Sequence, residues 1–222
     1  MSDLFKPQIT TIEDAIQQQI RLQSQVRIES LDIRTIKEIT ALKATCLSSK
    51  SIGIAMRLSF PNMQIKQVSF GEYSTSFPYY PGLYTTCAAP ALVQAIAQLN
   101  ERSDVFIVEG HGAAHPRRFG LACYLGVGLD MPTFGCARTL LTGKMQPLAE
   151  EEGSSAEIFE SEEVIGIAYL SKAGCKPVYL SVGHRMDLES VLHIAKSLFQ
   201  GYRMPEPLRL ANQYIRRSIQ ED

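Results

Sequence analysis

The feature that most constrains this chain is a short, almost purely apolar run at residues 104–108 (DVFIV), which leads directly into Glu109-Gly110-His111-Gly112. An apolar run of this length, without polar alternation, is typical of a central strand buried on both faces. Open α/β sheets place their sites at the carboxyl ends of such strands. The polar residues that follow Val108 are therefore candidate site residues.

Apolar periodicity along the rest of the chain predicts a mixed α/β fold. Helical spacing predicts helices at residues 10–26, 89–99, 118–125 and 187–199. Alternating or clustered apolar residues predict strands at residues 51–58, 64–70, 129–131, 133–136, 164–170 and 178–182. The first two strands form an antiparallel hairpin ahead of the crossover helices, and residues 150–163 are predicted to be an acidic loop. Because no repeat or linker interrupts this order, residues 1–222 are expected to form a single domain.

The charge balance gives no general signal for nucleic-acid binding. Lys and Arg number 22 against 23 acidic residues, so the formal net charge is −1. Any nucleic-acid binding would need basic side chains gathered on one face. No charged leader precedes an apolar stretch, and no run approaches the roughly 20 apolar residues of a membrane span. We therefore expect a cytoplasmic protein without a membrane segment.

The five cysteines, Cys46, Cys87, Cys123, Cys136 and Cys175, are widely spaced and include no CxxC pair. This pattern offers no zinc site and suits a reducing compartment. The cysteines are therefore expected to be reduced and to act as small buried apolar residues.

Three groups of residues between about residues 52 and 210 follow one another in a recognisable order. The first is Pro78-Tyr79-Tyr80-Pro81-Gly82-Leu83 with Pro90-Ala91-Leu92. The second runs from Asp104 to Gly112 and on through residues 115–122 (HPRRFGLA), 130–133 (DMPT) and 135–138 (GCAR). The third comprises residues 171–173 (SKA), 183–185 (GHR) and 201–207 (GYRMPEP). Together they resemble the endonuclease V family, which nicks DNA or RNA near deaminated adenine, meaning inosine. The resemblance implies a ribonuclease H-like fold, with a mixed central sheet, a leading antiparallel hairpin and flanking helices.

The resemblance also implies a metal site, which this sequence keeps only in part. In the family, two or three carboxylates gather a divalent metal that activates water and neutralises developing charge. A Gly-x-Asp position on the first strand of the hairpin is matched to Ala55, and a glutamate after the wedge loop is matched to Ala88. The third acid is matched to Glu109 and the family lysine to Arg138. With Glu109 as at most one weak ligand, no cofactor is expected, or Mg²⁺ if activity is retained. Glu109, His115 and Arg138 remain as residual catalytic candidates.

The nucleic-acid-binding residues look better preserved than the metal ligands. Pro78, Tyr79, Tyr80 and Pro81 resemble the family's wedge, which fills the place of an extruded base. The alternative is a proline-tyrosine turn packed in the core.

The flipped-base pocket of the family is matched by Gly82, Tyr84, Gly110 and Gly120, because glycine lets the backbone approach a base edge. Each glycine on its own could equally be a turn residue. Arg117 and Arg118, with His115, could contact phosphates. His111 and His184 can instead be structural histidines.

Three functions are compatible with this pattern. The leading hypothesis is a pseudonuclease that binds DNA or RNA, for example with a flipped or deaminated base, but cleaves poorly or not at all. The alternative is an active metal-dependent endonuclease that nicks near inosine in DNA repair. A protein-interaction scaffold that binds a protein partner and no nucleic acid is the third.

Overall fold

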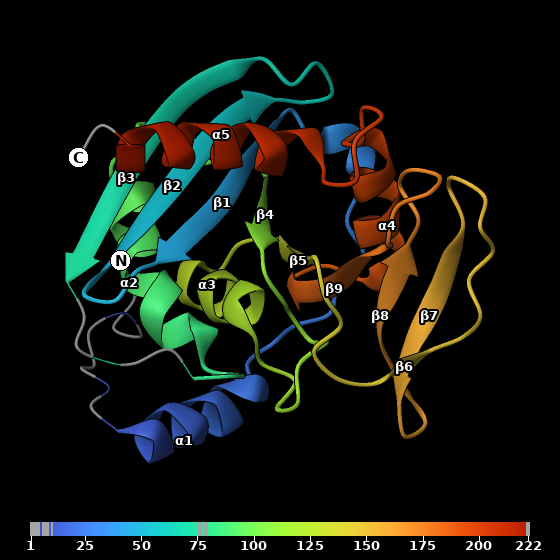
Figure 1. The fold of residues 1–222 in the computed structure, drawn as a ribbon, viewed down its shortest axis with the longest axis horizontal. Coiled ribbons are helices and arrows are strands. Elements are labelled where there is room, and N and C mark those ends of the chain that lie inside the picture. The colour runs from blue at the N-terminus through green and yellow to red at the C-terminus, as the bar shows by residue number, and fades with distance from the viewer. Residues whose placement is uncertain (1–4, 6–8, 10, 75–76, 78–79, 221–222) are drawn as a thin grey trace.

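The computed structural model describes residues 5, 9, 11–74, 77 and 80–220. A nine-stranded mixed sheet in the order β3-β2-β1-β4-β5-β9-β8-β7-β6 forms its centre (Figure 1). The strands are β1 (Glu38–Cys46), β2 (Lys50–Ser59), β3 (Ile65–Ser74), β4 (Val105–Glu109), β5 (Thr133–Ala137), β6 (Lys144–Met145), β7 (Ser155–Glu160), β8 (Glu163–Tyr169) and β9 (Val178–His184). β1, β2 and β3 form an antiparallel meander, whereas β1, β4 and β5 are parallel. The predicted ribonuclease H-like class is confirmed.

Helices cover both faces of this sheet. They are α1 (Ile12–Gln23), the 3₁₀ turn η2 (Ile33–Thr35), α2 (Tyr84–Ala97), α3 (Leu121–Leu129), α4 (Leu188–Ser197) and α5 (Glu206–Gln220). α2 and α3 pack on one face, and α4 and α5 pack on the other, with α5 lying across β1 and β2 (Figure 1). None of the described helices is long and apolar enough to cross a membrane.

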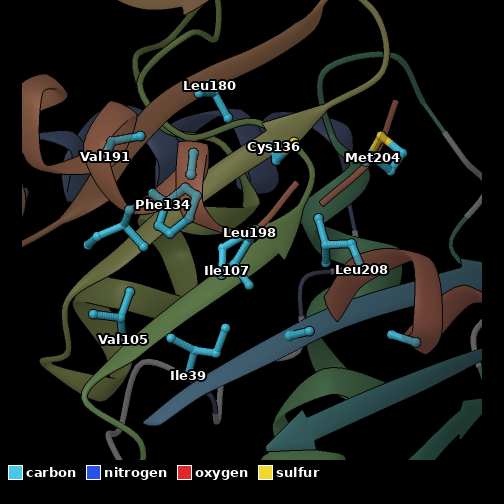
Figure 2. Packing of buried hydrophobic residues seen from close by; sticks show 14 of the residues in the cluster. Ile39, Val105, Ile107, Phe134, Cys136, Leu180, Val191, Leu198, Met204 and Leu208 are labelled. Carbon is cyan, nitrogen blue, oxygen red and sulfur yellow. The ribbon is translucent and has the colours of Figure 1, made fainter. Parts of the chain in front are cut away.

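β4 confirms the strand predicted at residues 104–108. Its side chains pack alternately into two separate cores. Val105 and Ile107 join the core under α4 and α5, where Figure 2 shows Ile107 with Phe134, Leu198 and Leu208. Phe106 and Val108 join the core under α2 and α3. All four are at most 1% exposed. A strand buried on both faces cannot show polar alternation in its sequence.

α2 lies unusually close to the β2–β3 pair because two glycines face it. A Cβ atom built on Gly71 would lie 2.1 Å from the carbonyl oxygen of Ala91, and one on Gly53 would lie 2.7 Å from the Ala91 carbonyl carbon. Such distances are impossible for a real side chain, so only glycine allows this approach. The position of α2 over the hairpin is thereby fixed.

Several elements differ from the sequence expectations. Residues 129–131, expected to be a strand, instead form the end of α3 and the turn after it, with Asp130 as the left-handed cap. β1 was not predicted, because its residues are buried on both faces over most of its length and its alternation is hidden. The amphipathic helix α5 was also missed, although Glu206-Pro207 can occupy its first turn. Residues 155–160 of the expected acidic loop form β7, which pairs with β8. The hairpin expected to lead the sheet is therefore its second and third strands.

Candidate active site

A pocket opens at the carboxyl ends of β1 and β4, where α2 and α3 begin. Its volume is about 270 Å³. It is lined by Lys43, Gly82, Tyr84, Thr85, Glu109, Gly110, His111, His115, Gly120, Leu121, Ala137, Arg138, Thr139 and Leu141. Most of the predicted pocket residues are thus brought together at the sheet edge where the sequence placed them.

The carboxylate of Glu109 lies between two cationic side chains. Lys43 Nζ is 2.7 Å from its Oε2, and Arg138 Nε is 2.8 Å from its Oε1. The side chains of Lys43 and Glu109 are each only 13% exposed. Among the described residues Oε2 has no well-directed hydrogen bond, so the ion pair with Lys43 is what balances it. Both oxygens that a metal would need already face a cation.

Lys43 reaches Glu109 because of the register between neighbouring strands. β1 pairs with β4 in parallel, with Leu42 opposite Val108. The residues that follow them, Lys43 and Glu109, therefore lie side by side. The sequence interpretation did not single out Lys43. A lone charged residue between Ala41-Leu42 and Ala44 was a usable signal, but its meaning depends on a strand that was not predicted.

Ala55 and Ala88, the two positions matched to lost metal ligands, do not line the pocket. Ala55 pairs with Leu42, whereas Lys43 pairs with Ile54. Paired residues project to the same face and neighbours project to opposite faces, so Ala55 points away from the side that carries Lys43. Both alanines are fully buried in the core beneath α2 and α3. Moreover, Ala55 lies on the second strand of the meander, not on its first.

His115 is engaged on both ring nitrogens. Its Nε2 lies 2.9 Å from the carbonyl oxygen of Gly82, and its Nδ1 accepts from the backbone N–H of Arg117 at 3.2 Å. Nε2 therefore carries the proton and donates it to Gly82. Burial lowers the pKa of His115 to about 4. At neutral pH this ring is an uncharged positioning group for the Gly82 backbone.

Arg117 supports the same backbone atom, whereas Arg118 points elsewhere. Arg117 donates to the Gly82 carbonyl at 2.8 Å and to Gln19 Oε1 at 2.6 Å. Arg118 is paired with Glu160 at 2.5 Å and Glu163 at 2.7 Å, on β7 and β8. Neither arginine lines the pocket, and Arg118 is already neutralised by two carboxylates.

One described residue of the predicted wedge, Tyr80, is 48% exposed and lies two residues before Gly82, which lines the pocket. Pro78 and Tyr79 lie outside the described residues. Pro81 and Gly82 connect Tyr80 to α2, and Gly82 has φ +78°, a conformation that favours glycine.

Tyr84 and the other glycines shape the pocket wall. The hydroxyl of Tyr84 donates to the carbonyl of Ala44 at 2.8 Å, which fixes its ring against the end of β1. Gly110 has φ +157°, and a Cβ on Gly120 would lie 2.3 Å from the carbonyl oxygen of His111. Gly120 therefore has no room for a side chain, and Gly110 has a backbone conformation that other residues rarely adopt.

The two remaining histidines make defined hydrogen bonds. His111 Nε2 lies 2.9 Å from the Thr139 carbonyl, and burial lowers the pKa of His111. His184 accepts from the backbone N–H of Arg27 at 3.2 Å and contacts Asp130 at 3.2 Å, outside the pocket. His184 therefore connects three parts of the fold.

The structure corrects the expectation that all five cysteines are reduced, because Cys46 and Cys87 form a disulfide. Cys46 ends β1 and Cys87 lies in the first half of α2, which packs across that end with a Cα–Cα distance of 6.1 Å, within normal disulfide reach. A separation of 41 residues hides this proximity in the sequence. Cys123, Cys136 and Cys175 are free.

Within the part of the chain that the structure describes, no group of three or more His, Cys, Asp or Glu residues could hold a metal ion. Glu109 contributes a single carboxylate, and its neighbours are Lys43 and Arg138. The residues present therefore do not fit a divalent cation.

Known proteins are similar in sequence to most of this chain. Endonuclease V of Methanothrix thermoacetophila is 36% identical over 200 residues, covering 90% of this chain and 88% of that protein. Endonuclease V of Nostoc punctiforme is 35% identical over 205 residues, covering 91% and 93%.

Solved structures give the same result. The crystal structure of endonuclease V from Streptomyces avermitilis superposes with a TM-score of 0.89 at 30% identity, covering 96% of this chain and 95% of that one. A Ciona intestinalis endonuclease V, crystallised in complex with a DNA containing an inosine followed by a ribo-adenosine, shares the fold at 22% identity with a TM-score of 0.82, covering 96% and 99%. The Endonuclease V family model matches residues 17–213, and the chain therefore belongs to the endonuclease V family.

Proposed function

We propose that this protein is a pseudonuclease, a nucleic-acid-binding member of its family that does not cleave by the family's metal-dependent route. The observation that carries the proposal is the pairing of Glu109 with both Lys43 and Arg138. A cation held at this carboxylate would have to displace an ammonium and a guanidinium that are already in contact. Mg²⁺ prefers several oxygen ligands, and the described pocket supplies one carboxylate.

Lys43 adds to the effect of the missing carboxylates. The family's first acid stands on the first strand of the hairpin, and that strand here is β1. On β1 it is Lys43 that lies beside Glu109, with its Nζ 2.7 Å from Oε2. A lysine there repels a divalent cation, whereas an alanine would only fail to bind one.

Nucleic-acid binding is supported by the pocket and by a relative. The Ciona intestinalis protein binds a DNA that contains inosine. In this chain the exposed Tyr80 stands near a glycine-lined pocket at the same end of the sheet. We propose DNA or RNA with a flipped base, inosine in particular, as the ligand.

A nicking assay on inosine-containing DNA and RNA tests the proposal. We expect no specific nick with Mg²⁺ or Mn²⁺, because removal of a metal that contributes several kcal/mol to the transition state costs powers of ten in rate. Robust metal-dependent cleavage by the wild-type chain would show instead an active endonuclease with a rearranged site.

A reverse substitution sharpens the assay. Lys43→Asp, which places a second carboxylate beside Glu109, should raise cleavage and should also bind Tb³⁺, measured by luminescence. The matched control is Ala55→Asp. It should gain neither property, since Ala55 projects to the opposite face of the sheet. Circular dichroism must show that each variant is folded.

A further inference from the structure

We propose that Lys43 and Arg138 together bind a phosphate of the nucleic-acid strand directly, so that binding needs no divalent metal. The inference rests on the proposed function and gives it a molecular basis. Lys43 is the cation that the first strand supplies to the pocket, and Arg138 follows the end of β5.

The pocket carries a local positive charge that favours an anion, although the whole chain has a small negative net charge. Its charged lining residues are two cations, Lys43 and Arg138, and one anion, Glu109. The pocket is therefore positive within a chain of net charge −1. A low-dielectric cleft of one sign concentrates ligands of the other sign.

Both cations keep donors beyond those that face Glu109. Lys43 carries three N–H donors on Nζ, and one contact to Glu109 Oε2 leaves the others for a second acceptor. Arg138 uses Nε toward Glu109 Oε1, and its guanidinium has four further N–H donors. The planar guanidinium fork matches the geometry of a phosphate.

Exposure distinguishes this cluster from an ion pair that only stabilises the core. The side chain of Arg138 is 43% exposed while Glu109, which it contacts, is 13% exposed. The backbone of Arg138 is held in turn by Arg203, whose guanidinium donates to its carbonyl at 2.5 Å. Glu109 thus acts as a positioning residue that orients two cations toward an open pocket.

The test measures binding of a fluorescein-labelled single-stranded DNA that contains one inosine, by fluorescence anisotropy. At constant ionic strength, we expect the affinity in EDTA to equal that in Mg²⁺ within about twofold. The double variant Lys43→Met/Glu109→Gln preserves net charge and leaves no unpaired carboxylate. It should bind about tenfold more weakly, since hydrogen bonds to charged groups are the strong ones. The slope of its logarithmic salt dependence should fall by about 0.7, the value for one phosphate of a single strand that is no longer neutralised by the protein.

A control pair lies at the other end of the same strand. Arg57→Met/Glu38→Gln removes a cross-strand pair of similar burial, five residues before Lys43 and therefore about 16 Å away along β1. This control should bind as the wild type does. If the first double variant is unfolded, Arg138→Met is the second test, because its more exposed side chain can be removed with less disturbance, and it should show the same loss.

The outcomes separate this inference from the proposed function. Unchanged affinity in both pocket variants, or binding that vanishes in EDTA, would overturn direct phosphate binding even when no cleavage occurs. Metal-dependent cleavage would overturn the proposed function instead. Loss of affinity only in the pocket variants, without any nick, supports both.

Discussion

The two ends of β1 carry charge clusters of opposite composition. At the amino end, Arg57 contacts two acids: its Nη1 lies 2.7 Å from Glu38 Oε2 and also contacts Glu101. At the carboxyl end, one acid, Glu109, contacts two cations. Both central groups are nearly buried, Arg57 at 10% and Glu109 at 13% side-chain exposure.

Only one of these two clusters borders the pocket. Glu38, Arg57 and Glu101 are not among the pocket lining residues, and Glu101 is 71% exposed. The amino-end cluster therefore resembles an ordinary surface network. The comparison teaches that burial and pairing alone do not mark a functional group. The carboxyl-end cluster differs from the amino-end cluster because its three charged side chains line an open pocket.

The largest expected difference between the two ends concerns the disulfide, which ties only the carboxyl end of β1 to a helix. Cys87→Ser, or reduction of the wild-type chain, should lower the free energy of unfolding by about 2 to 4 kcal/mol, because the crosslink restricts the unfolded chain. Differential scanning fluorimetry with and without reductant measures the shift. Cys175→Ser is the control and should leave it unchanged. Five titratable thiols in unreduced, denatured protein would contradict the pairing.

The next largest expected effect is a sensitivity to acid at the carboxyl end. His115 has a folded pKa of about 4 against an ordinary value of 6.5. The unfolded chain therefore binds this proton first, and stability is lost as the pH falls from about 6.5 to about 4. The loss is on the order of 3 kcal/mol, and it is fully restored above pH 7.

Chemical denaturation at a series of pH values measures this loss. His115→Gln keeps a donor for the Gly82 carbonyl but cannot titrate, so its stability should decline less steeply over that range. Parallel pH profiles of the two proteins would show that His115 is not the group responsible.

The smallest expected difference is between the central residues of the two clusters. Glu109→Gln leaves two cations side by side without the carboxylate that pairs with both, and should cost about 2 kcal/mol of stability. Arg57→Gln should cost about 1 kcal/mol, because the exposed Glu101 can turn into solvent. Urea unfolding of both variants provides the comparison, and a larger loss for Arg57→Gln would reverse it.

The sequence predicted the fold class and the location of the site from local patterns. The apolar strand at residues 104–108 and the polar residues after it do not depend on the rest of the chain. Glu109, Gly110, His111, His115 and Arg138 all line the pocket found in the structure.

The contact between Lys43 and Glu109 could not be predicted from the sequence, because it depends on how the strands pair. Lys43 faces Glu109 only because β1 lies between β2 and β4, and β1 has no readable alternation. Without β1, Ala55 was expected on the first strand of the hairpin, whereas the structure places it on the second strand, β2. The Cys46–Cys87 disulfide was not predicted for the same reason, because the end of β1 and α2 are close in the folded structure but distant in the sequence.

The carbonyl oxygen of Gly82 accepts from three partners, Gln19 at 3.2 Å, His115 at 2.9 Å and Arg117 at 2.8 Å. Gln19 belongs to α1, so the first helix of the chain helps to hold a loop that lies 63 residues further along. Shortening or editing α1 would therefore be felt at the mouth of the pocket, although no residue of α1 lines it. For protein engineers, the amino-terminal segment is part of the ligand-facing architecture and not a dispensable extension.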